Sequence, residues 1–433
     1  MHALHHSSSG LSPAIVAALI AVPVGLLTIV VQWLGMLRVS RDTKTKLQQQ
    51  GRQLDRTLAE QRVQLDRTLA EQRDRTLNER FTAAADMLGS DKPAAVRLAG
   101  VYAMAGLADD WEKNRQTCVD VLCAYLRLPY EPDPGEDASA DDRLTFRANQ
   151  QVRHTLIRVI ADHLRQGAAN PWRGLTFDFA GTRFDGGDFS GVVFSGGTAD
   201  FTGAKFFEDG LDFELADFSG AAVFFTVAEF SAELVHFGGA KFSGGLVDFQ
   251  QAVFSGGTVS FEGAKFSGST VGFQQAKFSG STVSFGGIDS FGAMFSGGKV
   301  NFEGAAFASG LVNFEGAAFS GGTVSFEVAE FSGGKVSFEG AEVADGLVSF
   351  EGAKFSCGTI GFQEVLFSGG TVPFGWAEFS GGTVGFGGAK FSGSTVDLCN
   401  VRNWSRPPRF DFGGTPPLGV KLPSDRLARP PVD

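Results

Sequence analysis

The stretch at residues 249–285, FQQAVFSGGTVSFEGAKFSGSTVGFQQAKFSGSTVSF, repeats one short pattern and decides the fold. Phenylalanine recurs at alternating distances of five and seven residues, and in most copies Ala or Val stands two positions before it. The unit is therefore a pentapeptide, (Ala/Val)-x-Phe-x-x, with two extra residues after every second copy. The same pattern extends from Phe179 to Leu398, with one additional five-residue unit, Ile288 to Gly292.

This period predicts stacked extended units and excludes helix, because it matches neither a 3.6-residue nor a long two-residue repeat. Alternate residues of an extended chain point to the same side, so each Phe and the Ala or Val two before it face one core. Glycine and serine after each Phe can turn the corner. Four sides with their inserts predict about 24 residues per coil and about nine coils stacked at roughly 4.8 Å.

With this pattern, residues 169–400 resemble the pentapeptide-repeat family. The resemblance implies a right-handed quadrilateral β-helix with Phe or Leu at the central inward position. The recurring two-residue insert, as at Gly257-Thr258 and Gly322-Thr323, departs from the regular repeat and resembles a variant class. We therefore expect loops or bulges on two opposite sides of each coil.

Residues 13–37 form an uncharged, almost wholly apolar run, which predicts a transmembrane helix. A cleaved signal peptide is the alternative, but residues 1–12 lack the Lys or Arg that a signal peptide carries. Basic residues follow at Arg38, Arg41, Lys44 and Lys46, so the positive-inside rule predicts residues 1–12 as an extracytoplasmic tail and the repeat domain in the cytoplasm.

Residues 38–80 contain a near-perfect duplication, QLDRTLAEQRV followed by QLDRTLAEQRD. Leucines recur along it with an eleven-residue period, which predicts a nearly straight helical stalk. We expect a coiled-coil homo-oligomer through residues 44–80, with a single helix packed on its own domain as the alternative.

The segments that flank the repeats have their own patterns. Residues 81–128 predict a helical domain built as a hairpin, 129–147 an acidic proline-rich linker, 148–168 a capping helix, and 401–433 a Pro-rich tail. The whole layout resembles a group of bacterial membrane-anchored pentapeptide-repeat proteins. That resemblance implies a single-pass protein of the bacterial cytoplasmic membrane, with the lipid bilayer as one partner.

No enzyme motif is present: the chain lacks a P-loop, HExxH, GxSxG and CxxC. Six histidines and four cysteines form no ligand pattern, so we assign no catalytic, cofactor-binding or metal residues and expect a non-enzymatic protein. Direct nucleic-acid binding is not expected, because the chain carries a net charge of −11.

Charge on the repeats supplies the candidate site. Residues 178–397 hold 25 Asp and Glu against 9 Lys and Arg, a net charge of −16. Five glutamates recur in the slot after a Phe and form a candidate acidic interaction row: Glu303, Glu315, Glu327, Glu339 and Glu351. Such charges solubilise a rod in any case. We expect a membrane-tethered scaffold that binds an unidentified protein. The alternative is a DNA-mimicking modulator of gyrase or another nucleic-acid-binding protein, as quinolone-resistance pentapeptide proteins are understood to be.

Overall fold

The computed structural model describes residues 13–89, 91–131, 133–287, 292–412 and 415–424. The predicted tail at 1–12, four residues of the additional repeat unit (288–291) and the last nine residues lie outside the described part. The chain divides into two compact units, Met1–Asn78 and Glu79–Asp433, and each is described by itself.

The first unit is dominated by one long helix, α1 (Pro13–Met87), which continues beyond the unit's end. A span of the bilayer needs about 20 consecutive apolar residues. Among the described residues, no helix has a stretch that is both long enough and apolar enough to cross a membrane. The predicted transmembrane helix at residues 13–37 is therefore wrong, and so is the predicted single-pass localisation in a cytoplasmic membrane.

Four helical elements of the second unit precede the repeats: α2 (Ala94–Asp110), the short 3₁₀ helix η1 (Glu112–Asn114), α3 (Arg115–Arg127) and α4 (Ala140–Leu164). Helix α2 packs against both α3 and α4. Helix α4 begins within the predicted linker, because the Ser139 hydroxyl caps it by accepting a hydrogen bond from the Asp142 amide at 3.1 Å.

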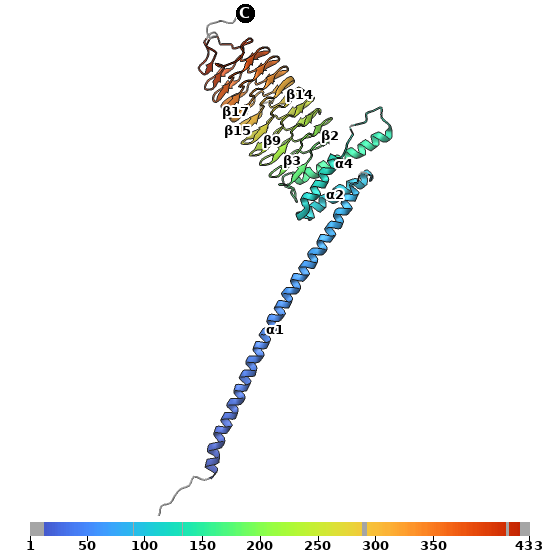
Figure 1. Ribbon diagram of the computed structural model, residues 1–433, viewed down its shortest axis with the longest axis vertical. Coiled ribbons are helices and arrows are strands. Elements are labelled where there is room, and N and C mark those ends of the chain that lie inside the picture. The colour runs from blue at the N-terminus through green and yellow to red at the C-terminus, as the bar shows by residue number, and fades with distance from the viewer. Residues whose placement is uncertain (1–12, 90, 132, 288–291, 413–414, 425–433) are drawn as a thin grey trace, which may run out of the picture. The chain divides into compact units, whose positions relative to one another are not determined.

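The repeats form a β-solenoid of about ten turns, so the predicted solenoid with a helical N-terminal region is confirmed (Figure 1). Its strands run parallel in two sheets. The first sheet contains β1 (Thr176–Asp178), β3 (Thr198–Asp200), β5 (Ala222–Phe224), β8 (Lys241–Ser243), β9 (Leu246–Asp248), β12 (Lys265–Ser267), β13 (Thr270–Gly272), β15 (Met294–Asn301), β17 (Ala318–Ser325), β20 (Glu342–Ser349), β23 (Leu366–Phe367), β24 (Thr371–Pro373), β27 (Lys390–Phe391), β28 (Thr395–Asp397) and β29 (Val420–Lys421).

The second sheet contains β2 (Arg183–Phe184), β4 (Lys205–Phe206), β6 (Glu229–Phe230), β7 (Leu234–His236), β10 (Val253–Phe254), β11 (Thr258–Ser260), β14 (Lys277–Ser284), β16 (Ala306–Asn313), β18 (Glu330–Phe331), β19 (Lys335–Ser337), β21 (Lys354–Phe355), β22 (Thr359–Gly361), β25 (Glu378–Phe379) and β26 (Thr383–Gly385). Residues 24 apart pair along most of its length, as Thr258 does with Thr282. The spacing is 29 where the additional unit intervenes, as between Phe278 and Phe307.

Phenylalanine fills the interior of the solenoid. In one ladder the rings of Phe237, Phe261 and Phe285 stack at 4.8 Å with 5° between their planes. That distance equals the spacing of neighbouring strands, so each ring sits directly over the equivalent ring of the next coil. The aromatic interior is therefore continuous along the rod, with Val343 in place of one Phe between Phe319 and Phe367.

Two kinds of turn connect the faces of a coil. At the tight corner, Phe-x-x-Ala, the Ala amide donates to the Phe carbonyl, as Ala264 does to Phe261 at 3.0 Å. The third residue of this corner has φ above zero, as in a type II turn. The insert bend carries the two extra residues, and in the middle coils the strand continues through it with a bulge, as in β14 and β16. The expected bulges are thus present, and they lie within each sheet.

The helices cover the first coil. The side-chain amide of Gln116 in α3 donates to the Thr176 carbonyl at 2.7 Å and accepts from the Thr176 amide at 2.9 Å, so it satisfies the edge of β1 as another strand would. At the other end the coils continue past residue 400, into the predicted tail. Phe410 stacks on Phe386 at 4.7 Å, and β29 pairs with β28.

Candidate functional site

The five predicted glutamates all occupy the first position after the Phe of a tight corner, but they do not form one row. Because successive members are 12 residues apart and a coil takes 24, alternate members follow strands of different sheets. Glu303, Glu327 and Glu351 stack in consecutive coils, and we call them the Glu303 column. Glu315 and Glu339 stack half a coil away as the Glu315 column.

Backbone hydrogen bonds set the stacking in each column. The Gly304 amide donates to the Glu327 carbonyl and the Val328 amide to the Glu351 carbonyl, both at 2.9 Å. In the other column the Gly316 amide donates to the Glu339 carbonyl at 3.0 Å. Neighbouring glutamates are therefore one strand spacing apart, close enough for their charges to repel each other.

The residue at the end of each strand holds the corner in place. In the Glu303 column the glutamate amides donate to Asn301 Oδ1 at 3.2 Å, Ser325 Oγ at 3.3 Å and Ser349 Oγ at 3.4 Å. These contacts are the turns in which Asx and Ser side chains bind the backbone two residues on. The strand-end side chains thus hold the corner's backbone, and at Asn301 the side-chain amide also donates to the Glu303 carboxylate, at 3.4 Å.

Within the described residues, none of the five carboxylates lies in an ion pair. The strand faces of the same rod differ: Lys205 pairs with Glu229 at 2.9 Å, and Lys354 pairs with Glu330 at 2.8 Å. The Glu330 carboxylate raises the pKa of Lys354 by accepting its hydrogen bond. Glu229 and Glu330 on the strand faces are therefore neutralised by a lysine of a neighbouring coil, whereas the five corner glutamates lie in no ion pair within the described residues.

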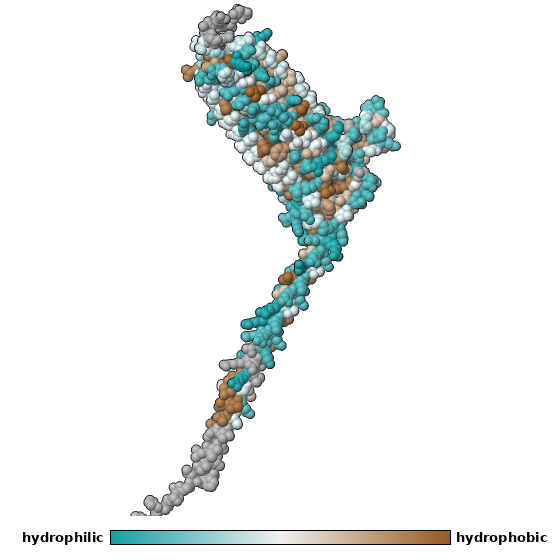
Figure 2. Space-filling view, in the orientation of Figure 1, coloured by the Kyte–Doolittle hydropathy of each residue, from teal (hydrophilic) through white to brown (hydrophobic). Residues whose placement is uncertain are grey.

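Apolar side chains lie beside the Glu303 column, at the second position after the Phe, which is the corner residue with φ above zero. Val328 is 53% exposed and Trp376 is 70% exposed, and both have φ above zero, at 49° and 60°. A β-branched or bulky residue in this region is a genuine outlier. Figure 2 shows isolated hydrophobic patches on an otherwise polar face of the rod. The sequence could have revealed Val328 and Trp376, because the equivalent position of many other corners holds Gly.

A buried polar network joins the helices to the first coil, and the sequence analysis missed it. The Asp185 carboxylate, whose side chain is 2% exposed, accepts hydrogen bonds from Tyr130 at 2.5 Å and Gln150 at 3.0 Å, and contacts His154 Nε2 at 3.0 Å. Burial alone would raise the pKa of Asp185, but the hydrogen bonds from His154 and Tyr130 outweigh it and leave that pKa lowered. The network fixes the helical cap to the first coil.

All four cysteines are free thiols. Burial raises the pKa of Cys118 to about 11 and that of Cys123 to about 12, so both remain protonated and unreactive. Cys357 and Cys399 are exposed. Neither exposed thiol has a histidine partner among the described hydrogen bonds, so the thiols provide no nucleophile–base pair.

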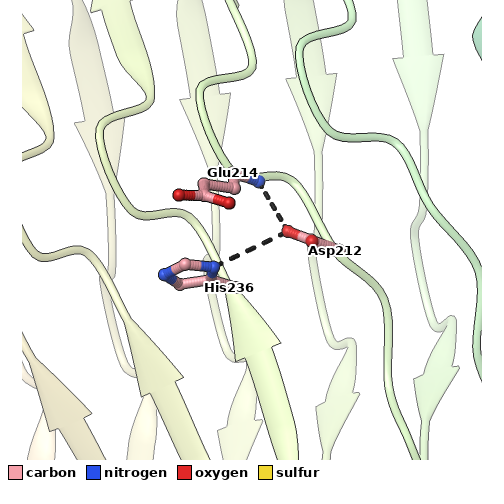
Figure 3. A group of neighbouring side chains, drawn as sticks. All are labelled: Asp212, Glu214 and His236. Atoms are coloured by element: carbon pink, nitrogen blue, oxygen red, sulfur yellow. Dashed lines mark hydrogen bonds and ion pairs between the residues drawn. The ribbon is translucent and has the colours of Figure 1, made fainter.

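One group of metal-ligating side chains comes together in the described part of the chain: Asp212, Glu214 and His236 (Figure 3). One ligand atom from each lies within 4.8 Å of the others. The sequence predicts no metal residues when its histidines are compared only with one another, whereas Asp212 and His236 lie 24 residues, or one coil, apart.

No family model, curated protein or solved structure matches this chain. The likeness to pentapeptide repeats therefore rests on the solenoid and its regularly spaced phenylalanines, which are consistent with that fold.

Proposed function

We propose that the solenoid is a rigid, non-enzymatic scaffold that binds a basic protein along its acidic corners. The surface of interest comprises Glu303, Glu327, Val328, Glu351 and Trp376, and we call it the Glu303 edge. The observation that carries the proposal is the stacking of three unpaired carboxylates in consecutive coils. Solubility requires only scattered charge, whereas stacked like charges cost stability in the free protein.

The chemistry of the edge favours arginine in the partner. Two Glu carboxylates one strand spacing apart match the planar guanidinium, which binds carboxylates with two parallel hydrogen bonds. The exposed indole of Trp376 offers a face for a cation–π contact. The Glu351 carboxylate lies against the next coil at Gly375, the residue before Trp376, because its Oε1 is 3.3 Å from where a Cβ on Gly375 would be.

The rod's interior supports a binding role over catalysis. Its four phenylalanine ladders are buried along their length, and catalysis requires a concave site with convergent polar groups. A continuous stacked core also makes the surface rigid, so a partner binds without the entropic cost of ordering it.

The test is crosslinked capture of partners from cells that produce the full chain. One variant carries Glu303→Lys, Glu327→Lys and Glu351→Lys. Its matched control carries Glu229→Lys, Glu330→Lys and Glu378→Lys, an identical change in net charge on the strand face, where each of these residues pairs with a cation of a neighbouring coil. We expect the edge variant to lose basic partners that the control retains. Equal retention by both variants would refute the proposal.

A DNA-mimicking modulator of gyrase or another nucleic-acid-binding protein is the second candidate, favoured by the net charge of −16 over residues 178–397. Each glutamate column presents one charge per strand spacing of about 4.8 Å, against about 3.4 Å per phosphate along one DNA strand. The Glu303 column is also only three coils long. If the protein captured in the test above is a DNA-binding enzyme and duplex DNA competes it away, this candidate replaces the general scaffold.

We further propose that α1 associates with a second copy of the chain. Its leucine stripe, which recurs every eleven residues, is exposed in the single chain: Leu47, Leu54, Leu58, Leu65 and Leu69. Light scattering of the full chain should show an oligomer that Leu54→Asp with Leu65→Asp converts to a monomer. Arg56→Asp with Arg67→Asp, on the opposite face of the helix, should leave the oligomer intact. A monomeric wild type would refute this proposal.

A further inference from the structure

The solenoid brings three slots together wherever a tight corner meets the next coil. They are the residue that ends a strand, the residue directly after the Phe of the corner that follows, and the strand-end residue 24 positions after the first. In one coil these slots hold Asp212, Glu214 and His236, and Asp212 and His236 pair in parallel register. Figure 3 shows the Asp212 carboxylate between the Glu214 amide and the His236 imidazole, with the Glu214 carboxylate extending past the imidazole.

The distances suit a metal ion. His236 Nδ1 lies 3.7 Å from Asp212 Oδ1, and one ligand atom of each residue lies within 4.8 Å of the other two. Zinc binds imidazole nitrogen and carboxylate oxygen at about 2.0–2.2 Å, which places its ligand atoms roughly 3.4 Å apart. Small rotations of the exposed Glu214 side chain would close the remaining gap.

Side chains in two of these slots are in contact elsewhere in the rod. Two coils further on, the equivalent slots hold Ser260, Glu262 and Ser284, and Ser284 Oγ donates to Glu262 Oε1 at 3.3 Å. A glutamate in the corner slot therefore turns toward the next coil's strand end. Among the described residues, the three slots are occupied by three ligating groups only at Asp212, Glu214 and His236.

The surroundings hold no competing cation at these ligands. Glu214 lies in no ion pair within the described residues, and Asp212 has only His236 as a charged contact there. Asp212 Oδ1 also accepts a hydrogen bond from the Glu214 amide at 2.7 Å, which orients the carboxylate. The neighbouring carboxylate of Asp188, one coil earlier, is already neutralised by Arg165 at 2.9 Å. Gly238 leaves room for the imidazole, because a Cβ at that position would lie 2.5 Å from His236 Nε2.

We propose that Asp212, Glu214 and His236 form a binding site for a divalent transition metal, with Zn²⁺ as the best match. One imidazole with two carboxylates favours zinc over Mg²⁺ and Ca²⁺, which prefer sites made of oxygen alone. Water completes the coordination because the site is partly exposed. The bound ion joins two consecutive coils near the capped end of the rod.

The test is calorimetric titration of ZnCl₂ into the full chain. Other ligands are first removed from the background with His2→Ala, His5→Ala, His6→Ala, Cys357→Ser and Cys399→Ser. We expect one equivalent of zinc, with affinity reduced at least about tenfold by His236→Gln and by Asp212→Asn. The matched control Asp200→Asn, in the same slot on the other sheet, should bind as the background does. Absence of zinc uptake by the background, or full retention by His236→Gln, would overturn the site.

A second variant tests the geometry of the slots by building a second zinc site into the rod. Ser260→Asp with Ser284→His places the same three ligand types around Glu262, two coils away. We expect the stoichiometry to rise from one zinc to two, with circular dichroism confirming that the variant is folded. A folded variant that still binds a single zinc would contradict the geometry on which the site depends.

Discussion

The two kinds of turn in each coil differ sharply in what they tolerate. At the insert bend, a column of glycines approaches the previous coil so closely that an added Cβ would lie 2.1–2.6 Å from a backbone carbonyl oxygen: Gly298, Gly322, Gly346 and Gly370. At the tight corner, Gly316 and Gly340 have no atom within 4 Å of that position. The bend is therefore fixed by stacking, while the corner has room for Glu, Val and Trp. The bends therefore restrict the side chains that the fold accepts, whereas the corners can carry the side chains of the proposed binding surface.

The sharpest test of this difference is one methyl group placed in each turn. Gly298 and Gly316 both have positive φ, at 74° and 66°. Gly316→Ala should cost about 1–2 kcal/mol, the penalty for a side chain in the left-handed region. Gly298→Ala should cost about 2–5 kcal/mol, because overpacking against Ser269 adds about 1–3 kcal/mol. Urea denaturation of the two variants checks this, and equal losses would erase the distinction between bend and corner.

Removing a strained side chain from the corner should stabilise the rod. Val328 adopts φ of 49° and is half exposed, so it contributes strain and little burial. Val328→Gly should raise the free energy of unfolding by about 0.5–1 kcal/mol, after the greater entropy of Gly in the unfolded chain is subtracted. The denaturation midpoint would measure it. A clear loss of stability would mean that Val328 packs as a core residue.

The hydrogen bonds at the tight corner should contribute moderately to the free energy of unfolding. Ser325→Ala removes the acceptor for the Glu327 amide and should cost about 0.5–1.5 kcal/mol. Ser325→Asn should restore most of that, since Asn301 fills the equivalent slot one coil earlier. Hydrogen exchange at the Glu327 amide reports the change locally. Unchanged protection in the alanine variant would show that the corner needs no side-chain acceptor.

Removing an ion pair from a strand face should change the free energy of unfolding least. Lys205→Met removes the exposed ion pair with Glu229 and should cost no more than about 0.2–1 kcal/mol. The loss should vanish in 1 M salt, where charges are screened within about 3 Å. Thermal denaturation at low and high salt is the measurement, and a salt-independent loss would point to packing of the lysine stem.

The sequence pattern predicts the core of the solenoid and part of its surface. The Phe ladders were predictable, because a five-plus-seven spacing with Ala or Val two positions earlier fits only an inward stripe. The pairing of Asp212 with His236 was also accessible, since both lie 24 residues apart in the predicted coil. The predicted row of five glutamates combined two columns, because a 12-residue recurrence was taken as one face of a 24-residue coil.

Contacts made by the segments outside the repeat could not be predicted from the repeat pattern. The Asp185 network brings together residues 130, 150, 154 and 185, and no repeat links those segments. The two-residue insert locates each bend, but the close approach of its glycines to the previous coil is a backbone contact that side-chain periodicity does not report. The apolar run at 13–37 predicted a membrane span that the helix α1 does not provide.

The most direct test of the central claim is the stability of a neutralised Glu303 column. In Glu303→Gln with Glu327→Gln and Glu351→Gln, both neighbouring repulsions disappear, so the account predicts a gain of about 0.2–1 kcal/mol for each at low salt. The gain should disappear in 1 M salt. The same change at Glu229, Glu330 and Glu378, which are paired, should produce no gain. A column variant that is instead less stable than the wild type would show that these carboxylates stabilise the fold and would contradict their proposed role in binding a partner.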